Sequence, residues 1–336
     1  MEENKDIMLS VRDLAISFYG KTGEVQAVRG ISYDLKKGEV LGIVGESGSG
    51  KSVSTHGILR LTPDTGKIKS GEILFEGRDI LKMNKKELQS LRGNRISMIF
   101  QDPMTALDPL FTVGYQLNES LKKHTDLNKE ERHKRMLELL PLVGINEPER
   151  RLKQYPHELS GGMRQRIMIA IALSCNPALL IADEPTTALD VTIQAQIIDL
   201  LKDLKEKLGM AIIFITHDLG VVSDICDRII VMYAGKIVEE GSSREIFYSH
   251  RHPYTQGLLD SVPDISTDQD QRLKPIPGNP PIMTQVRPGC AFAERCSCAM
   301  GICVKQDPPL FDLGGTHTAA CWKLLQENSN AVPDTV

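Results

Sequence analysis

The sequence lacks any apolar run long enough to cross a bilayer. Its longest apolar stretches, such as residues 167–173, fall far short of the roughly 20 residues that a transmembrane helix needs. Residues 1–6 are mostly charged, and no apolar core of a signal peptide follows them. We therefore expect the chain to stay in the cytosol and to reach a membrane only through a partner.

An excess of basic residues is also missing. The 336 residues include 40 Lys and Arg against 44 Asp and Glu, which gives a net charge of −4. Such a balance offers no overall basic surface to a polyanion, so we expect no nucleic-acid partner. With 41% hydrophobic residues, the chain is long enough for one sizeable α/β core and a smaller appended unit.

What the sequence does contain is a glycine-rich loop between two apolar segments. Residues 40–44 read as a buried strand, and residues 53–59 read as part of a helix. The loop between them has a glycine, four residues and then Gly-Lys-Ser, the pattern of a phosphate-binding P-loop. Its residues are Gly45, Glu46, Ser47, Gly48, Ser49, Gly50, Lys51 and Ser52. Backbone N–H groups of such a loop and of the following helix converge on one anion, so we expect a polyphosphate ligand.

The residue types in this loop match that ligand. Glycine lets the backbone approach the phosphates, Lys51 supplies a positive charge to the terminal phosphates, and Ser52 supplies a hydroxyl to Mg²⁺. The alternative is a mobile Gly/Ser linker. A linker, however, would not carry a lysine at this position between two apolar elements.

Polar residues follow two predicted buried strands. Gln101 follows residues 96–100 and is a candidate ligand of Mg²⁺ or water, because α/β sheets place ligand contacts at the carboxyl ends of their strands. Asp183 and Glu184 follow the apolar residues 178–182. There Asp183 suits holding Mg²⁺, and Glu184 suits polarising the attacking water. The alternative for this acidic pair is a solvated turn, which is less favoured because a P-loop needs a metal-holding acid.

Two further motifs suit a phosphate. His217 follows a third apolar strand, residues 210–216, where a histidine is either structural or able to donate a hydrogen bond to a γ-phosphate. Ser160 precedes a helical stretch that it can cap. Gly161 and Gly162 leave the amides at the start of that helix open, which predicts a second anion site.

The remaining pattern predicts the framework around these motifs. Phe18 and Tyr19 end the first predicted strand, where an aromatic side chain either stacks on a nucleotide base or anchors a hairpin. Further strands are predicted at 9–18, 25–35, 72–75 and in a hairpin of 229–234 and 236–240. Helices are predicted at 85–92, 128–140, after Ser160, and at 192–208.

In order and spacing, these motifs resemble those of the ATP-binding cassette (ABC) subunits of membrane transporters. The resemblance covers residues 9–245, and its most specific part is Leu-Ser-Gly-Gly at 159–162 between the P-loop and the Asp-Glu strand. It implies an α/β fold, namely a P-loop NTPase core with an antiparallel β subdomain and a helical subdomain. We accordingly place the nucleotide-binding domain at residues 1–250 and its helical subdomain at about 102–175.

The resemblance also implies which residues hold the cofactors, ATP and Mg²⁺. Phe18 or Tyr19 stacks on adenine, and the P-loop binds the phosphates. The residues implied to hold Mg²⁺ are Ser52, Gln101 and Asp183.

For the chemistry, the resemblance implies Glu184 as the general base and His217 as the γ-phosphate clamp. Gln101 senses the metal and couples to the membrane subunits. In the family, Ser160 and Gly162 act on nucleotide held by the opposing subunit, so hydrolysis requires a dimer. Two more residues of these motifs, Gly161 and Asp190, are also counted as nucleotide-binding.

Two segments are similar to one subfamily, the oligopeptide/dipeptide permease ATP-binding subunits, whose relatives also import nickel. They are residues 100–109 and the tail from 252 to 321. The similarity implies a second, related ABC ATPase subunit, two transmembrane permease subunits and an extracytoplasmic solute-binding protein as partners. It places the chain on the cytoplasmic face of the cell membrane as a peripheral membrane protein.

The last part of the chain concentrates the cysteines. A proline-rich connector at 275–288 leads into it, and we place a small Cys-rich C-terminal domain at 251–336. Disulfides are not expected in a reducing cytosol. Zinc usually takes more closely spaced Cys pairs, and a cluster held by four thiolates fits better, but zinc and unliganded thiols both remain open. The five cysteines here are Cys290, Cys296, Cys298, Cys303 and Cys321.

The subfamily tail resembles this one at Cys290, Cys296, Cys303 and Cys321, which implies a [4Fe-4S] cluster of structural or regulatory role. Cys298 lies outside that pattern, so which four thiols are ligands stays open.

Two other functions are compatible with a P-loop. One is a soluble cassette ATPase that acts on DNA or ribosomes, but such chains carry two cassettes or a long coiled coil between P-loop and signature. The gap from Lys51 to Ser160 has room for neither. The other is an iron–sulfur redox module with a vestigial ATPase, which predicts damaged nucleotide motifs, whereas every motif here is intact.

Overall fold

The computed structural model describes residues 6–21, 23–187, 189–261, 275–281, 283–284 and 288–325. The chain divides into two compact units. The first unit comprises Met1–Met8, Leu35–Val40 and Lys82–Ile215. The second comprises Leu9–Asp34, Leu41–Leu81 and Thr216–Val336. Among the described residues, no helix combines the length and the apolar character that crossing a membrane requires.

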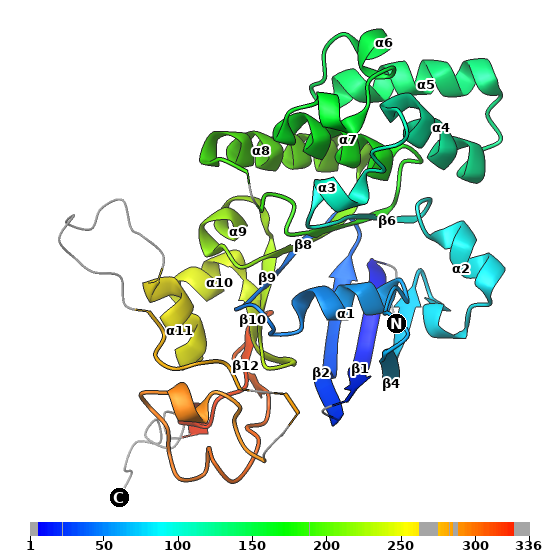
Figure 1. Ribbon diagram of the computed structural model, residues 1–336. Coiled ribbons are helices and arrows are strands. Elements are labelled where there is room, and N and C mark those ends of the chain that lie inside the picture. Colours follow the sequence, from blue (N-terminus) through cyan, green and yellow to red (C-terminus); the bar gives the residue numbers. More distant parts are fainter. Residues whose placement is uncertain are drawn as a thin grey trace, which may run out of the picture. The chain divides into compact units, whose positions relative to one another are not determined.

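Three parallel strands position the polar residues of the first unit. They are β6 (Ile96–Ile99), β7 (Leu179–Asp183) and β8 (Ala211–Thr216), of which Figure 1 labels β6 and β8. Ile99 pairs with Ala182, and Asp183 pairs with Ile215. Strands β7 and β8 are buried along their whole length, as expected for parallel strands covered on both faces. Their carboxyl ends therefore meet at one edge of the sheet.

Helices make up most of the rest of the first unit. Helices α4, α5 and α7 pack against one another, and Leu117, Leu121 and Leu139 are fully buried between them (Figure 1). Helix α8 buries Ile197, Leu201 and Leu204 on one face. The bounds are α2 Lys85–Leu91, α3 Pro103–Ala106, α4 Val113–His124, α5 Lys129–Leu142, α6 Pro148–Arg151, η2 Pro156–Glu158, α7 Gly161–Leu173 and α8 Val191–Leu208.

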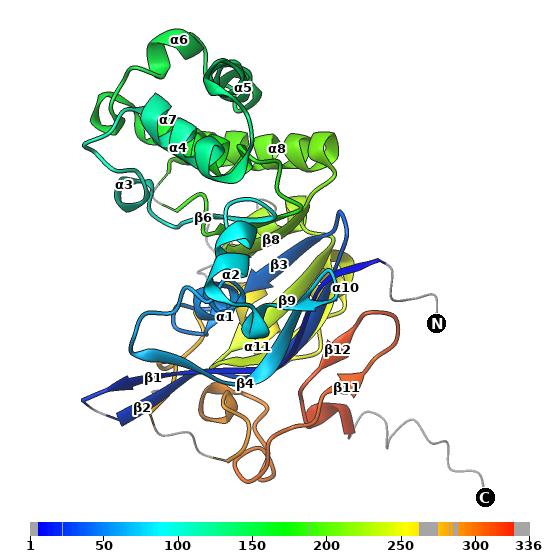
Figure 2. The ribbon, with the colours of Figure 1, turned by 90° about the vertical axis from the view of Figure 1, so that its right-hand side faces the viewer.

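The second unit contains an antiparallel sheet in the order β2-β1-β4-β5 (Figure 2). Ile16 of β1 packs closely against Gly57 of helix α1. A Cβ added at Gly57 would lie only 2.5 Å from the Ile16 side chain. The bounds are β1 Ile7–Gly20, β2 Gly23–Lys36, β4 Gly66–Phe75 and β5 Arg78–Asp79, with η1 at Ile80–Lys82 and α1 at Lys51–Ile58.

Further strands of the second unit run in the order β11-β12-β10-β9-β3. Strand β3 is parallel to β9, with Ile43 opposite Ile230, and β9 and β10 form the hairpin predicted about Gly235. The bounds are β3 Val40–Val44, β9 Arg228–Tyr233, β10 Lys236–Ser242, β11 Phe311–Asp312 and β12 Thr318–Ala319. The helical segments are α9 Leu219–Ile225, α10 Ser243–Tyr248, α11 Pro253–Asp260 and η3 Ala293–Arg295.

A buried carboxylate ties the C-terminal tail to this sheet. Glu239 of β10 is fully buried and accepts hydrogen bonds from the backbone N–H groups of Arg251 (2.6 Å) and His252 (3.0 Å). Its Oε1 also lies 2.9 Å from Nε2 of His317. Strand β12 extends the sheet beside it, with Ala319 opposite Glu239. The cysteine-bearing tail is thus an integral part of the second unit.

Candidate functional site

Close contacts require glycine at two positions of the P-loop. Gly45 has φ +150°, and a Cβ there would lie 2.2 Å from the carbonyl oxygen of Met232 in β9. Gly50 has φ +100°, and a Cβ there would lie 2.4 Å from the carbonyl oxygen of Ala27 in β2. Any side chain at either position would displace backbone, so the loop conformation depends on these two glycines.

Helix α1 starts at the end of this loop without a side-chain cap. Its N-cap residue, Gly50, has a left-handed conformation, and no acidic residue lies in the first turn. The amides of such a helix start, together with the helix dipole, favour an anion. Ser52 is half-buried in the first turn, where a hydroxyl can reach a metal bound to that anion.

Lys51 folds back over the loop. Its Nζ donates to the carbonyl oxygens of Gly45 (2.7 Å) and Glu46 (3.0 Å), and the residue is only 5% exposed. Ser49 Oγ is buried and has no hydrogen-bond partner within the part of the chain that the structure describes. Ser47 and Gly48 are exposed at the loop tip. A buried ammonium and an unsatisfied hydroxyl at one loop fit a polyphosphate ligand.

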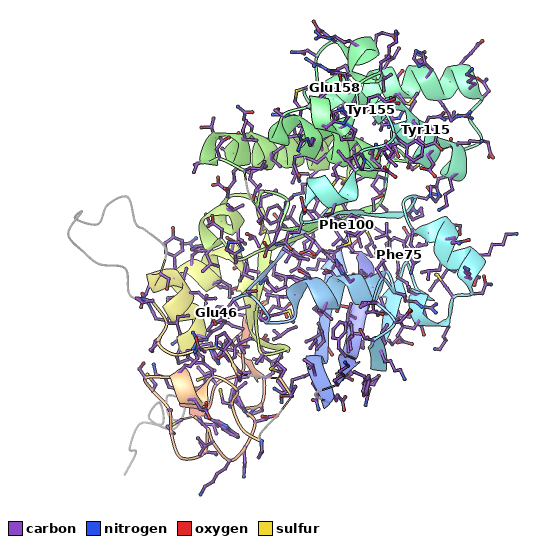
Figure 3. All side chains as sticks on the ribbon, in the orientation of Figure 1. Glu46, Phe75, Phe100, Tyr115, Tyr155 and Glu158 are labelled. Carbon is purple, nitrogen blue, oxygen red and sulfur yellow. The ribbon has the colours of Figure 1, made fainter. Side chains whose placement is uncertain are left out.

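Glu46, in the same loop, is bound by residues far along the chain. Its carboxylate receives both terminal nitrogens of Arg295, at 2.6 and 2.9 Å, and its backbone N–H donates to Tyr254 Oη at 2.8 Å. Figure 3 labels Glu46 beside helix α11, which carries Tyr254. The sequence analysis did not predict either contact. No local pattern signals an ion pair whose partners are 249 positions apart.

The two candidate adenine-binding aromatics have different surroundings. Phe18 is half-buried against Gly66, where an added Cβ would lie 2.8 Å from the Phe18 ring. Tyr19 is 38% exposed, and Nζ of Lys67 and of Lys69 each lie 5.5 Å from its ring centroid. Only the Tyr19 ring is both exposed and flanked by cations.

His217 belongs to the second unit and is exposed directly after β8. The next residue, Asp218, caps helix α9 by accepting from the backbone N–H of Gly220 at 2.9 Å. The imidazole therefore stands on a short, well-defined turn between a buried strand and a helix.

In the first unit, the structure brings Gln101 and Glu184 together. Gln101 Nε2 donates to Glu184 Oε2 at 2.9 Å, and Thr187 Oγ1 donates to the same oxygen at 2.8 Å. The backbone N–H of Glu184 donates to Ile215 of β8 at 2.9 Å, which holds the residue at the strand edge. Sequence reasoning placed Gln101 and Glu184 correctly at strand ends but missed Thr187.

The backbone at Glu184 is strained. Its φ is +46°, in the left-handed region that residues other than glycine rarely adopt. Asp183, the preceding residue, ends β7 and is 3% exposed. The unusual φ follows directly after a buried strand and gives the two neighbouring carboxylates different environments, one buried and one half-buried. Such strain is typical of functional sites.

The signature segment caps its helix as predicted. Ser160 Oγ accepts from the backbone N–H of Met163 at 3.3 Å at the start of α7. Gly162 faces α8, where an added Cβ would lie 3.0 Å from the Ile193 side chain. A Cβ added at Gly161 would lie 4.0 Å from the Leu189 side chain, which is an ordinary contact distance. Gln165 of the same helix is buried and donates to the carbonyl oxygen of Pro185 at 2.6 Å. Helix α7 is thereby tied to the loop that follows Glu184.

Asp190 caps helix α8 by accepting from the backbone N–H of Ile193 at 3.0 Å. Ala188, in the motif before it, lies outside the described residues.

Exposed apolar side chains gather on the helical part of the first unit. Phe111 and Tyr115 stack with ring centroids 4.4 Å apart, and Leu110 beside them is 78% exposed. Residues 113 and 114 bond to the backbone at 152 and 154, next to Tyr155, which is 40% exposed. Figure 3 labels Tyr115 and Tyr155 in this region. We call Leu110, Phe111, Tyr115 and Tyr155 the aromatic patch.

The tail cysteines line one pocket of the second unit. The pocket is lined by Cys290, Cys296, Cys298, Cys303 and Cys321. His252, Phe292 and Trp322 complete much of its wall. No group of three or more His, Cys, Asp or Glu among the described residues is placed to hold a single metal ion.

Burial controls the protonation of these thiols. Desolvation raises the pKa of Cys290 and of Cys296, and it raises the pKa of Cys321 to about 11. Neighbouring cysteine charges raise the pKa values further. The charge of Lys323, which also lines the pocket, opposes the rise in pKa at Cys296 but does not cancel it. With raised pKa values, Cys290, Cys296 and Cys321 are protonated at neutral pH, whereas a bound metal would favour their thiolates.

The two cysteines outside the tail differ. Both lie in apolar helical contexts of the sequence, which predicts a core position for each. Cys226 is buried, and burial strongly raises its pKa. Cys175 is only half-buried and lies beyond the end of helix α7, so the core prediction is wrong for this residue.

Sequence comparisons identify the family. A family model described as ABC transporter matches residues 28–187, and one described as Oligopeptide/dipeptide transporter, C-terminal region, matches residues 238–303. Oligopeptide transport ATP-binding protein OppD of Bacillus subtilis is 57% identical, over 97% of this chain and 91% of that protein. The chain belongs to the ABC transporter family. This ABC protein is also 52% identical to Dipeptide transport ATP-binding protein DppD of Bacillus subtilis, over 97% of each chain.

Solved ABC cassettes share its fold. The ATP-binding cassette MJ0796, in a dimeric structure with ADP and Pi, matches with a TM-score of 0.64 and 32% identity over 70% of this chain and 99% of that chain. CbiO1 of Clostridium perfringens matches with a TM-score of 0.63 and 31% identity over 73% and 92%. The expected P-loop ABC ATPase fold with mixed α/β sheets is confirmed. Family membership likewise confirms ATP hydrolysis, ATP and Mg²⁺ as cofactors, and membrane permease partners.

Proposed function

We propose that this chain powers an importer of dipeptides or oligopeptides by hydrolysing MgATP bound at residues 45–52. The observation that carries the proposal is the P-loop itself, with glycines that close contacts require, a buried Lys51 and an uncapped helix start. Relatives named as oligopeptide and dipeptide transport ATP-binding proteins support the class of solute. Nickel is the alternative cargo that the sequence analysis left open.

Each polar group has a role on the nucleotide in this proposal. Lys51 binds the terminal phosphates, and Ser52, with Gln101 and Asp183, holds Mg²⁺. When bound, Mg²⁺ supplies charge neutralisation to the phosphates. Glu184 accepts a proton from the attacking water, and its bonds from Gln101 and Thr187 orient it for that step. His217 donates to the γ-phosphate.

Tyr19 is the adenine platform in this proposal, in preference to Phe18. An aromatic face must be accessible before a base can stack on it, and Tyr19 is exposed whereas Phe18 packs against Gly66. Lys67 and Lys69 beside the Tyr19 ring add positive charge close to the nucleotide.

Partners complete the machine. Ser160, Gly161, Gly162 and Asp190 act on nucleotide held by a second ABC ATPase subunit. The aromatic patch binds one of two transmembrane permease subunits, since an exposed group of large apolar side chains is typical of a protein interface. An extracytoplasmic solute-binding protein delivers the cargo. The chain then acts as a peripheral protein on the cytoplasmic face of the membrane.

For the domain division, we propose nucleotide binding at 1–250, with the helical subdomain at about 102–175, and a Cys-rich domain at 251–336. That domain holds a [4Fe-4S] cluster through Cys290, Cys296, Cys303 and Cys321. The proposal is supported by the pocket of the second unit, which these four cysteines line together with Cys298. The cluster would supply a rigid, charged centre to the described residues 288–322, whose regular secondary structure is limited to η3, β11 and β12.

Nucleotide binding tests the proposed function. The full-length chain should bind a fluorescent ATP analogue in the presence of Mg²⁺, and Lys51→Ala should weaken binding at least tenfold, because it removes a charge-assisted phosphate contact. Lys134→Ala, an exposed change on helix α5, is the matched control and should bind as wild type. Unchanged affinity of the Lys51 variant would refute the assigned site.

Spectroscopy and metal analysis test the cluster. Anaerobically purified protein should be brown and contain about four iron and four sulfide per chain. Cys303→Ser should lose the colour, and Cys298→Ser should keep it. Colourless protein that contains zinc would overturn the iron assignment, and loss of colour in the Cys298 variant would overturn the choice of ligands.

A further inference from the structure

The P-loop is held from outside by the C-terminal tail, at a single residue. Glu46 uses its carboxylate, its backbone N–H and its carbonyl oxygen at once, toward Arg295, Tyr254 and Lys51. Lys51, which we assign to the phosphates, therefore shares a bonding partner with two tail residues. Any shift of Glu46 moves both the loop backbone and the acceptor of the Lys51 ammonium.

Arg295 is built to stay in place. Its side chain is 5% exposed, and Nε donates to the Pro277 carbonyl oxygen at 2.8 Å. The guanidinium lies 5.8 Å from the ring centroid of Tyr233 and 5.9 Å from that of Phe292. The hydrogen bonds to Glu46 raise the pKa of Arg295, and this effect is larger than the lowering caused by burial. A buried, bidentate arginine flanked by aromatic rings has one well-defined position, so it can hold the P-loop in one conformation.

The two residues that hold Glu46 also border the cysteine pocket. Arg295 precedes Cys296, and Tyr254 follows Pro253, and both Cys296 and Pro253 line the pocket. Phe292 also lines the pocket, and its ring centroid lies 5.3 Å from that of Tyr254. The carbonyl oxygen of Phe292 accepts a hydrogen bond from the backbone N–H of Arg295 at 3.0 Å. One wall of the pocket and one support of the P-loop are thus the same short segments of chain.

We propose that Arg295 and Tyr254 are positioning residues for the P-loop, and that through them the cysteine pocket and the nucleotide site are energetically coupled. The proposal rests on the nucleotide site assigned above at residues 45–52. Arg295 neutralises a carboxylate that would otherwise repel the phosphates, and both residues fix the loop before ATP arrives. Such coupling is reciprocal: if a ligand in the pocket changes the affinity for ATP by some factor, ATP changes the affinity for that ligand by the same factor.

A set of variants in the full-length chain separates charge pairing from simple damage. Arg295→Gln leaves Glu46 charged and unpaired, so the dissociation constant of a fluorescent ATP analogue should rise at least tenfold. Arg295→Lys keeps the charge but loses the fork, so it should fall between this variant and wild type. The double variant Glu46→Gln with Arg295→Gln should return to within threefold of wild type, because no unpaired charge remains. Lys305→Gln, an exposed change in the same tail, is the control.

Thiol labelling reads the other direction. In anaerobically purified protein, MgATP should change the alkylation rate of the pocket cysteines at least threefold, measured by mass spectrometry. The double variant, which still binds ATP, should show a smaller change, because the ionic link is gone. Such a loss cannot come from a failure to bind nucleotide.

The outcomes distinguish the two levels of the account. If Lys51→Ala binds ATP as wild type does, the nucleotide site itself is wrong. If Lys51→Ala loses binding while Arg295→Gln binds as wild type, the site stands and the positioning role is refuted. Failure of the double variant to recover would reduce Arg295 to a purely structural role, and equal labelling with and without MgATP would refute the coupling.

Discussion

Glu184 is held by its neighbours at three points. Gln101 and Thr187 both donate to its Oε2, and its backbone N–H is fixed to Ile215. The strained φ of +46° keeps the side chain at the strand edge instead of continuing β7. A general base works only if its lone pair is aimed at the proton, so orientation is as important as charge here.

Loss of one orienting bond should slow turnover without weakening binding. Thr187→Val removes the hydroxyl that donates to Glu184 and keeps a side chain of similar size. We expect kcat to fall about tenfold, the equivalent of one hydrogen bond of roughly 1.4 kcal/mol, with KM for ATP nearly unchanged. Steady-state ATP hydrolysis by the assembled transporter measures both constants. Thr186→Val, the neighbouring threonine, is the comparison, and an equal loss there would remove the special role of Thr187.

At the residue scale, the side chains at the ends of buried strands could be predicted from the sequence. Gln101 and Glu184 were each expected at the carboxyl end of a buried strand, where α/β sheets place ligand contacts, and the structure joins them at 2.9 Å. Thr187 and Arg295 were not predicted. Their contacts depend on how turns and distant segments fold back, for which neither periodicity nor a local motif carries a signal.

Side-chain caps fix where several helices begin. A helix was predicted from residue 128, and the Asn128 side chain caps α5 by accepting from the backbone N–H groups of Glu130 (2.9 Å) and Glu131 (3.0 Å), while Glu131 closes a capping box. The same chemistry starts α7 at Ser160 and α8 at Asp190. These starts could be predicted because a cap is a local interaction over three residues.

Removal of the α5 cap should cost stability and leave ATP binding intact. Asn128→Ala is expected to lower the free energy of unfolding by about 1 kcal/mol, because the first-turn amides lose their acceptor. Urea denaturation followed by circular dichroism measures this change. Lys134→Ala, exposed in the same helix, should stay within about 0.5 kcal/mol of wild type, and an equal loss in both variants would argue against the capping explanation.

Strand β4 shows what local patterns miss. It was predicted from residue 72, yet it starts at Gly66, because residues 66–70 pair with β1 while exposing mostly polar side chains. Backbone pairing and the bonds of Lys69 to Tyr19 and Glu24 hold this half of the strand, so hydrophobic alternation is too weak to reveal it.

The whole molecule depends on contacts between distant parts of the sequence. The tail is joined to the nucleotide-binding elements of the second unit through Glu239, through β12 and through the pair of Arg295 with Glu46. The sequence predicted a separate Cys-rich domain from composition, and composition does not reveal that a loop and a tail share a buried ion pair. The boundary at residue 250 stays a prediction.

At the same scale, the ABC family assignment makes the chain an ATP-hydrolysing subunit that has membrane permease partners. The central chemical claim of the proposed function is that Glu184 is the base that activates water. Replacement by the isosteric amide removes proton acceptance and preserves shape, so binding and chemistry separate cleanly.

The most direct measurement is ATP turnover by the Glu184→Gln variant in the transporter assembled with its membrane subunits. The account predicts that the variant binds MgATP with wild-type affinity and hydrolyses it at least 100-fold more slowly, the loss expected when a general base is removed. Hydrolysis by the variant at the wild-type rate would contradict it.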